Sequence, residues 1–412
     1  MRERLDRRPL VDRLPLGVRA GQPAAPPGKP EAAPAPSPGT PARTPPNLTA
    51  LLAEAHRLSD AQHPDAGAAW EAVARRAAEP DGAAAGLSDH DRACVEDHRA
   101  MYGSLPPAEA MAAFGRAAAL YEAAGDPGEA AAATGRAAYA RALEPGGADG
   151  ALAAIAPVVD RILALYADGA ATARQAGAAL VCRARILARL VQDAPDEAAA
   201  ESALAGLEQG ARELLAFTEP LRGKPGVATR TAEALDLLGD VAAFRGDPHG
   251  ALERYERAAA ETDGAGLSWY AVEYLAKASG LAAQLEEYGR AEAAARAALE
   301  HGAAFVPARG RARLHLRLAE VLAGNGQFTE AVEQALDAAH WADESGEGGT
   351  LGAHARHQLG GWLLRLGRPD AARERARRVL EIHGAGEPDE TGEERRAEAE
   401  ALLEYVGRRT GA

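Results

Sequence analysis

The sequence is poor in cysteine, in lysine and in aromatic residues, and each shortage narrows what the chain can be. Only Cys94 and Cys182 occur in 412 residues, which excludes a disulfide framework and favours a reducing compartment, the cytoplasm being the simplest. Aromatic residues make up 4% and β-branched residues are sparse, so helices are favoured over large sheets. Arginine supplies 43 of the 46 basic residues, which indicates a GC-rich genome such as that of a high-GC bacterium.

The signatures of catalytic and cofactor sites are also missing. The Gly-Lys pairs at Lys29 and Lys224 are each followed by proline, so neither belongs to a phosphate-binding loop. The sequence contains no His-Glu-x-x-His, no Gly-x-Ser-x-Gly, no dinucleotide fingerprint and no paired-cysteine zinc spacing. We therefore expect a protein that is not an enzyme and has no cofactor.

Charge and hydropathy exclude two further classes of partner. The net charge of −14 argues against nucleic-acid binding, which normally needs a basic face to replace phosphate counterions. No uninterrupted apolar run approaches the roughly 18 residues of a membrane span, and the Arg-rich start lacks the apolar segment of a secretory signal. We expect a cytoplasmic protein without membrane insertion.

Residues 1–47 form a segment of different composition, with 12 of the 26 prolines and with eight basic against four acidic side chains. This proline content predicts a disordered, extended arm without a core of its own. Its first 19 residues combine six arginines with several apolar side chains. Three interpretations stay open for residues 1–19: they dock a partner, they fold back onto an acidic groove of the same chain, or they are merely a disordered tail.

From Asn47 to about Arg409, apolar and alanine residues recur at three- and four-residue spacing, broken at regular intervals by Gly, Asp and Pro. Four similar segments, each reading helix, short turn and second helix, start at Leu237, Leu281, Leu318 and Leu359. An alanine recurs in their second helices with a period of 40 to 41 residues, at Ala251, Ala291, Ala331 and Ala372. Such self-similarity predicts a stack of helical hairpins, in which a small residue is needed where two helices cross.

These segments resemble the tetratricopeptide repeat, whose motif has Leu-Gly in the first helix, Gly at the turn and small or aromatic residues in the second helix. The motif positions are occupied by Leu238, Gly239, Gly246, Ala251, Tyr255 and Ala258, and again by Leu318, Ala319, Gly326, Phe328, Ala331, Ala335 and Ala338. The copy between them is weaker, with Ser279 where glycine is usual. The resemblance implies an all-α, right-handed α-α superhelix of about eight hairpins with a C-terminal capping helix.

The repeat frame also divides the chain. We expect an arm at 1–47, divergent hairpins at 48–230, well-matched repeats at 231–384 and a capping helix at 391–409. The divergent hairpins should turn near Asp65, Pro106, Gly150 and Pro195. Between residues 88 and 143, the repeat phase, that is, which helices pair into one hairpin, stays open, because the sequence at Gly125 also resembles the turn inside a hairpin.

One constellation is a weak candidate for a metal site. His90, Cys94 and His98 are spaced by four residues on a predicted helix that starts at the Ser88 cap, so they share a face. No fourth ligand is evident nearby, and Ser88 with Asp91 explains the local polarity as a helix cap. A buried cysteine flanked by surface histidines is the favoured interpretation, without a metal.

The resemblance implies a ligand groove along the first helices of the hairpins. The residues that map to its contact positions are Glu233, Asp236, Asp240, Phe244, Glu273, Lys277, Gln284, Arg313, Arg317, Glu320, His354, His357 and Arg365. Arg313 and Arg317 match two basic positions of repeats that bind chaperone tails, but Asp236 and Asp240 stand at the companion positions and would repel a terminal carboxylate. The alternatives are a bipolar peptide groove or ordinary solvated helix charges.

The leading functional prediction is therefore a scaffold or adaptor that binds another protein or a peptide. The alternative is a regulatory receptor that senses a peptide and switches an effector protein. A metal-dependent enzyme is a remote third.

Overall fold

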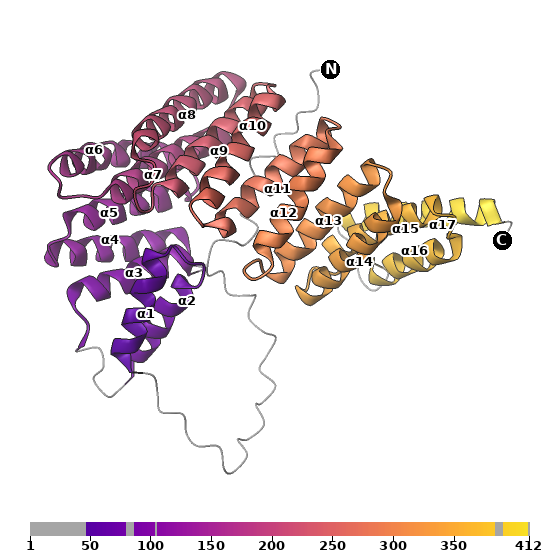
Figure 1. The fold of residues 1–412 in the computed structure, drawn as a ribbon, viewed down its shortest axis with the longest axis horizontal. Helices are drawn as coiled ribbons and strands as arrows, with labels where there is room; N and C mark the ends of the chain where they lie inside the picture. The colour runs from indigo at the N-terminus through magenta and orange to yellow at the C-terminus, as the bar shows by residue number, and fades with distance from the viewer. Residues whose placement is uncertain (1–46, 80–85, 104, 384–389, 411–412) are drawn as a thin grey trace, which may run out of the picture. The chain divides into compact units, whose positions relative to one another are not determined.

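The computed structural model describes residues 47–79, 86–103, 105–383 and 390–410, and every regular element in these ranges is a helix (Figure 1). The α-helices are α1 Leu48–Asp60, α2 Ala66–Ala77, α3 Asp89–Tyr102, α4 Pro107–Ala123, α5 Pro127–Ala142, α6 Ala148–Ala167, α7 Ala173–Asp193, α8 Glu197–Thr218, α9 Ala228–Phe244, α10 Pro248–Gly264, α11 Ser268–Gln284, α12 Tyr288–Gly302, α13 Ala308–Gly324, α14 Phe328–Glu344, α15 Leu351–Arg365, α16 Pro369–His383 and α17 Glu390–Thr410. A short 3-10 helix, η3 Glu219–Leu221, follows α8.

The described residues form two compact units that divide between Val241 and Ala242, within α9. Unit 1 holds α1 to α8 and most of α9, and unit 2 holds the end of α9 and α10 to α17. In each unit, helices that follow one another in the chain pack together, and α17 packs on α15 and α16. The predicted fold class, an all-α array of helical hairpins closed by a C-terminal helix, is confirmed. The predicted arm at 1–47 lies outside the described residues except for Asn47, which caps α1.

The four turns predicted in the divergent half fall close to the observed helix ends. Asp65 and Pro106 lie directly before α2 and α4, and Pro195 lies between α7 and α8. The third turn precedes Gly150 by a few residues, because α6 already starts at Ala148. Gly125 lies in the turn between α4 and α5. If α3 and α4 form one hairpin, this turn connects two successive hairpins.

The tight turns of the repeats depend on one residue in the left-handed region. Gly246, Gly326 and Gly367 have φ of 78°, 79° and 70°, values that glycine adopts without a steric penalty. After Gly246, for example, the amide of Asp247 donates to the carbonyl of Ala242 at 2.9 Å and thereby ends the helix. At the equivalent turn between α11 and α12 the residue is Glu286, with φ of 60°.

The recurring alanines occupy the helix contacts for which their size was predicted. Ala251, Ala291, Ala331 and Ala372 are all 0% exposed, each near the start of a second helix. The small residues of the first helices are buried as well, since Ser279 and Ala319 are also 0% exposed. A larger side chain at these positions would separate the helices.

Unit 1 contains a contact between its two ends. The side-chain amide of Gln62, in the turn between α1 and α2, donates to the hydroxyl of Thr229 at the start of α9, at 3.2 Å. The first hairpin of unit 1 therefore touches the last helix of the same unit, across 167 residues of sequence.

Helix α6 corrects one expectation from the sequence. In the described residues it is the one helix long and apolar enough to cross a membrane by length and composition, with a mean hydropathy of 1.6. Ile155, Val159 and Ile162 are buried in the core that α6 shares with α5 and α7, while Asp160 and Arg161 are exposed. The buried share of this apolar stretch is 22%, so only part of its apolar surface packs within unit 1.

Candidate functional site

The acidic groove residues predicted on α9 belong to unit 1. Asp236 and Asp240 are buried, and the carboxylate of Glu233 accepts a hydrogen bond from the Arg185 guanidinium of α7. Burial alone would lower the pKa of Arg185. The negative charge of Glu233 outweighs this effect and holds the pKa of the Arg185 guanidinium above its usual value, so Arg185 stays protonated. At Glu233, the predicted groove is therefore lined by an ion pair within the chain.

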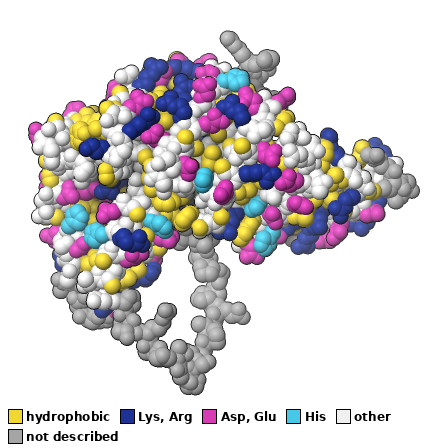
Figure 2. All heavy atoms as spheres, in the orientation of Figure 1, with side chains coloured by type: hydrophobic (Ala, Val, Ile, Leu, Met, Phe, Trp, Pro, Cys, Tyr) yellow, Lys and Arg dark blue, Asp and Glu magenta, His cyan; other side chains and the backbone are white. Residues whose placement is uncertain are grey.

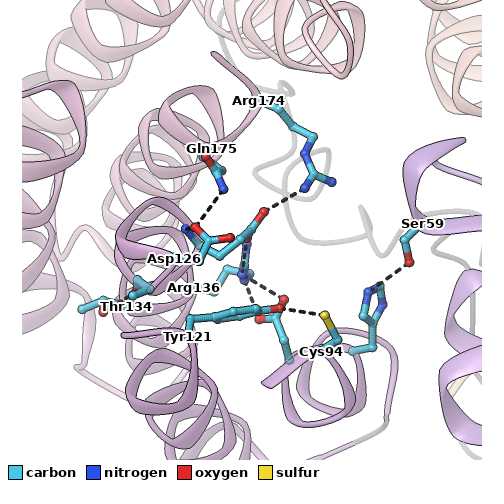
Figure 3. Close-up of polar contacts among 12 residues, drawn as sticks. Ser59, Cys94, Tyr121, Asp126, Thr134, Arg136, Arg174 and Gln175 are labelled. Carbon is cyan, nitrogen blue, oxygen red and sulfur yellow. Dashed lines mark hydrogen bonds and ion pairs between the residues drawn. The ribbon is translucent and has the colours of Figure 1, made fainter. Parts of the chain in front are cut away.

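A larger polar network connects the first helices α3, α5 and α7 of unit 1 (Figure 3). Arg136 of α5 donates to both carboxylate oxygens of Asp97 on α3, at 2.8 and 2.9 Å. Arg136 also lies 3.6 Å from Glu129, and Glu129 accepts a hydrogen bond from Arg174 of α7 at 2.8 Å. Two carboxylates and two guanidinium groups thus alternate, and their charges cancel.

The environment of this network sets the protonation of its members. Burial raises the pKa of Asp97 to about 6, although the positive charge of Arg136 opposes the shift. Burial also acts on Glu129, but Arg136 and Arg174 outweigh it and hold the pKa of Glu129 below its usual value. The network ties three helices together, and its guanidinium groups are occupied by carboxylates of the same chain.

The three candidate metal ligands on α3 are each in contact with aromatic side chains. The His98 ring stacks on Trp70 at 5.4 Å and on Tyr102 at 5.3 Å between centroids, while His90 packs against Tyr121 at 5.3 Å. The Tyr121 hydroxyl donates to Cys94 Sγ at 3.4 Å. The cap predicted at Ser88 is present, since Ser88 and Asp91 form a reciprocal capping box.

Protonation also disfavours metal binding there. Burial raises the pKa of the Cys94 thiol to about 12, so the thiolate that a metal or an electrophile needs is absent at neutral pH. Burial raises the pKa of Cys182 as well. Across the part of the chain that the structure describes, no three His, Cys, Asp or Glu side chains are grouped as a metal site.

In unit 2, side chains of adjacent first helices meet along one face of α11, α13 and α15. The guanidinium of Arg317 on α13 lies over Gly280 of α11, where an added Cβ would be 3.5 Å from its central carbon. Glu320 of α13 lies 3.5 Å from His354 Nε2 of α15 and 3.3 Å from Arg317. We call this surface, with Gly280, Arg317, Glu320, His354, Gln358 and Arg365, the first-helix face.

A pocket of about 400 Å³ opens on the first-helix face where α13 and α15 end. Its walls combine charged, amide and aromatic side chains with two small residues: Glu320, Ala323, Gly324, Phe328, Gln358, Trp362 and Arg365. The guanidinium of Arg365 lies 5.1 Å from the centre of the Phe328 ring, a cation–π contact that orients it. Gly324 is required, because an added Cβ would lie 2.4 Å from the Tyr288 ring.

The other predicted groove residues do not line the pocket. The Lys277 amine is 5.4 Å from the centre of the Tyr255 ring, and Phe244 is 44% exposed at the end of α9. Arg313 and His357 are half-buried on α13 and α15. Figure 2 shows acidic and basic side chains interspersed over the visible surface. The bipolar groove stays a prediction, since its acidic residues lie in unit 1 and its basic residues in unit 2.

Sequence reasoning found Glu320 and Arg365 but missed Phe328, Gln358 and Trp362 as pocket residues. A signal was present, because His354, Gln358 and Trp362 follow at intervals of four residues and Arg365 lies three residues further on, so all four share one side of α15. Phe328 had been assigned only to the turn motif.

The comparisons with known proteins agree with the repeat assignment. Residues 310–384 match the model of the tetratricopeptide repeat family. The segment from α13 to α16, which carries the pocket, is thus tetratricopeptide-repeat structure, as its motifs predicted. No curated protein matches the chain.

Several solved structures are similar in fold at low sequence identity. A Rap protein complexed with competence and sporulation factor is 16% identical, with 82% of this chain and 86% of that chain covered and a TM-score of 0.46. The apo form of RapI is 11% identical, with 88% and 98% covered and a TM-score of 0.44. BtubC from P. vanneervenii is 17% identical, with 50% and 90% covered and a TM-score of 0.37. These values say nothing about the ligand of this chain.

Proposed function

We propose that this chain is a non-enzymatic scaffold that binds a peptide, or an extended segment of another protein, on the first-helix face of unit 2. The observation that carries the proposal is the pocket of about 400 Å³ between α13 and α15. Its volume is in the range of ligand sites, and its lining is more polar than apolar, with the Phe328 and Trp362 rings beside charged and amide side chains.

The two sides of the repeats differ in a way that supports binding on this face. The second helices bury their recurring motif alanines, Ala251, Ala291, Ala331 and Ala372, completely. On the first-helix face, by contrast, Arg317 and Arg365 are exposed, and Gln358 is only partly covered. An extended peptide gains both aromatic contacts and hydrogen bonds there without displacing any packed element of unit 2.

Neither cysteine supports a catalytic alternative. Both thiols are free and buried, and burial raises the pKa of each. A protonated, covered thiol is a poor nucleophile. Free thiols also agree with a reducing location, and we propose the cytoplasm.

A selection from a random heptapeptide library displayed on phage, with the full chain as target, tests the proposal. We expect selected peptides to bind with an affinity that falls by at least about tenfold when Ala323→Phe fills the pocket, since most of the contact area is then blocked. The matched control is Ala293→Phe on the exposed side of α12, which should leave the affinity unchanged. Failure to select any peptide, or equal binding to the Ala323→Phe chain, would refute the proposal.

A further inference from the structure

The pocket carries one positive charge that no carboxylate of the described residues neutralises. Arg365 has no carboxylate within ion-pair distance among the described residues, and its contact is the ring of Phe328. The acidic residue of the pocket, Glu320, is shared between Arg317 at 3.3 Å and His354 at 3.5 Å. The charge left to face a ligand is therefore the guanidinium of Arg365.

Helices α13 and α15 are rich in arginine, but Arg309, Arg317 and Arg356 pair with carboxylates of the same chain. Helices α13 and α15 together carry six arginines and one glutamate, whereas α14 carries five acidic residues and no lysine or arginine. Arg356 is directed away from the face, to Asp343 of α14. On the first-helix face, Arg317 and Glu320 balance each other, and the exposed guanidinium of Arg365 is the group that attracts an anionic ligand.

The arrangement of the hydrogen-bond donors in the pocket further restricts the chemical class of the ligand. A guanidinium is planar and presents its N–H groups in one plane, which suits the two oxygens of a carboxylate. Gln358 adds an amide donor to the same pocket. The rings of Phe328 and Trp362 form an apolar wall beside these donors.

We propose that the pocket binds an acidic side chain of the partner peptide, with the Glu or Asp carboxylate on Arg365 and Gln358 and an adjacent apolar side chain on Phe328 and Trp362. This inference rests on the proposed function and specifies its ligand. A side chain is the source of the carboxylate because the first-helix face continues from the pocket toward His354 and Arg317, so that a bound peptide extends beyond the pocket.

The same heptapeptide selection, repeated with three forms of the chain, tests the ligand chemistry. Peptides selected by the wild type should be enriched in Glu or Asp next to an aromatic or aliphatic residue. Peptides selected by Arg365→Glu should be enriched in Lys or Arg instead. The control Arg368→Glu changes the net charge equally at an exposed residue outside the pocket, and it should keep the acidic preference.

A double-mutant cycle then locates the contact. Arg365→Ala should weaken binding of a selected acidic peptide on the order of tenfold, as loss of a charged hydrogen bond does. Replacing the peptide's Glu with Gln should have a similar effect, and the two changes together should cost little more than either alone. Additive effects, or selected peptides without an acidic preference, would overturn this inference and leave the proposed function standing. An empty selection would remove both.

Discussion

His98 offers a direct test of the packing in unit 1, because its environment allows only the neutral imidazole. The ring lies between Trp70 and Tyr102, and its Nε2 is 3.3 Å from the Ser59 hydroxyl. Its Nδ1 is buried without a hydrogen-bond partner. Burial, reinforced by the positive charge of Arg136, lowers the pKa of His98 from 6.5 to about 3.

The sign and size of the effect follow from linkage. Below pH 6.5 the unfolded chain binds a proton at this histidine, whereas the folded chain does so only near pH 3. The stability that His98 contributes above pH 6.5 is therefore lost as the pH falls toward 3. Between pH 7.5 and 5.0 the loss is about 2 kcal/mol, from roughly 1.5 pH units at 1.36 kcal/mol each. Asp97, with its raised pKa, acts in the opposite direction between about pH 6 and 4.

Two measurements check this prediction. NMR titration of the histidine side chains should find no protonation of His98 above about pH 4. Hydrogen exchange of the α3 amides measures the change in the free energy of opening from pH 7.5 to 5.0, and His98→Phe should make that change more favourable to the folded state by about 2 kcal/mol. The control His249→Gln alters an exposed histidine of unit 2 and should leave that change as it is in the wild type. A His98 that titrates near pH 6.5 would refute the buried, neutral assignment.

Two further predictions concern the repeat formed by α11 and α12, which departs from its neighbours at two positions. Ser279 is fully buried and its hydroxyl has no hydrogen-bond partner, whereas the next repeat has Ala319 there, so Ser279→Ala should raise the free energy of unfolding by about 1 kcal/mol. Glu286 has φ of 60° where Gly246 and Gly326 stand in the neighbouring turns, so Glu286→Gly should also stabilise the chain by about 1 kcal/mol. Urea unfolding followed by helical circular dichroism measures both, and an unchanged or lower midpoint in either variant would contradict its prediction.

The repeats were predictable from sequence because their constraint is local. An alanine at a helix crossing and a glycine at a tight turn are required by contacts within one hairpin, so they recur at a fixed period and can be counted. Ala251 and Gly246 are examples, and both occupy the places that the motif assigned to them. The apolar helix α6 was misjudged because Asp160 and Arg161 interrupt the run of letters, although the mean hydropathy stays high.

The site was less predictable because it depends on pairs of residues from different repeats. The motif located Glu320 and Arg365 by their positions in single helices. It could not show that Glu320 lies near both Arg317 and His354. Among the described residues, no carboxylate is then left within ion-pair distance of Arg365. The network of Asp97, Arg136 and Glu129 escaped notice for the same reason, since Asp97 is 32 residues from Glu129 and 39 residues from Arg136 in the sequence.

The hydrogen bond between Gln62 and Thr229 has a consequence for how unit 1 acquires its structure. In a linear array, each repeat is stabilised by its immediate neighbours alone, and the chain can fold from the ribosome outward as it emerges. Here the hairpin of α1 and α2 acquires its contact with Thr229 only after α9 has been synthesised. Loss of the hydroxyl in Thr229→Val should therefore loosen the amides of α1 and α2, far away in sequence, more than those of α4 or α5.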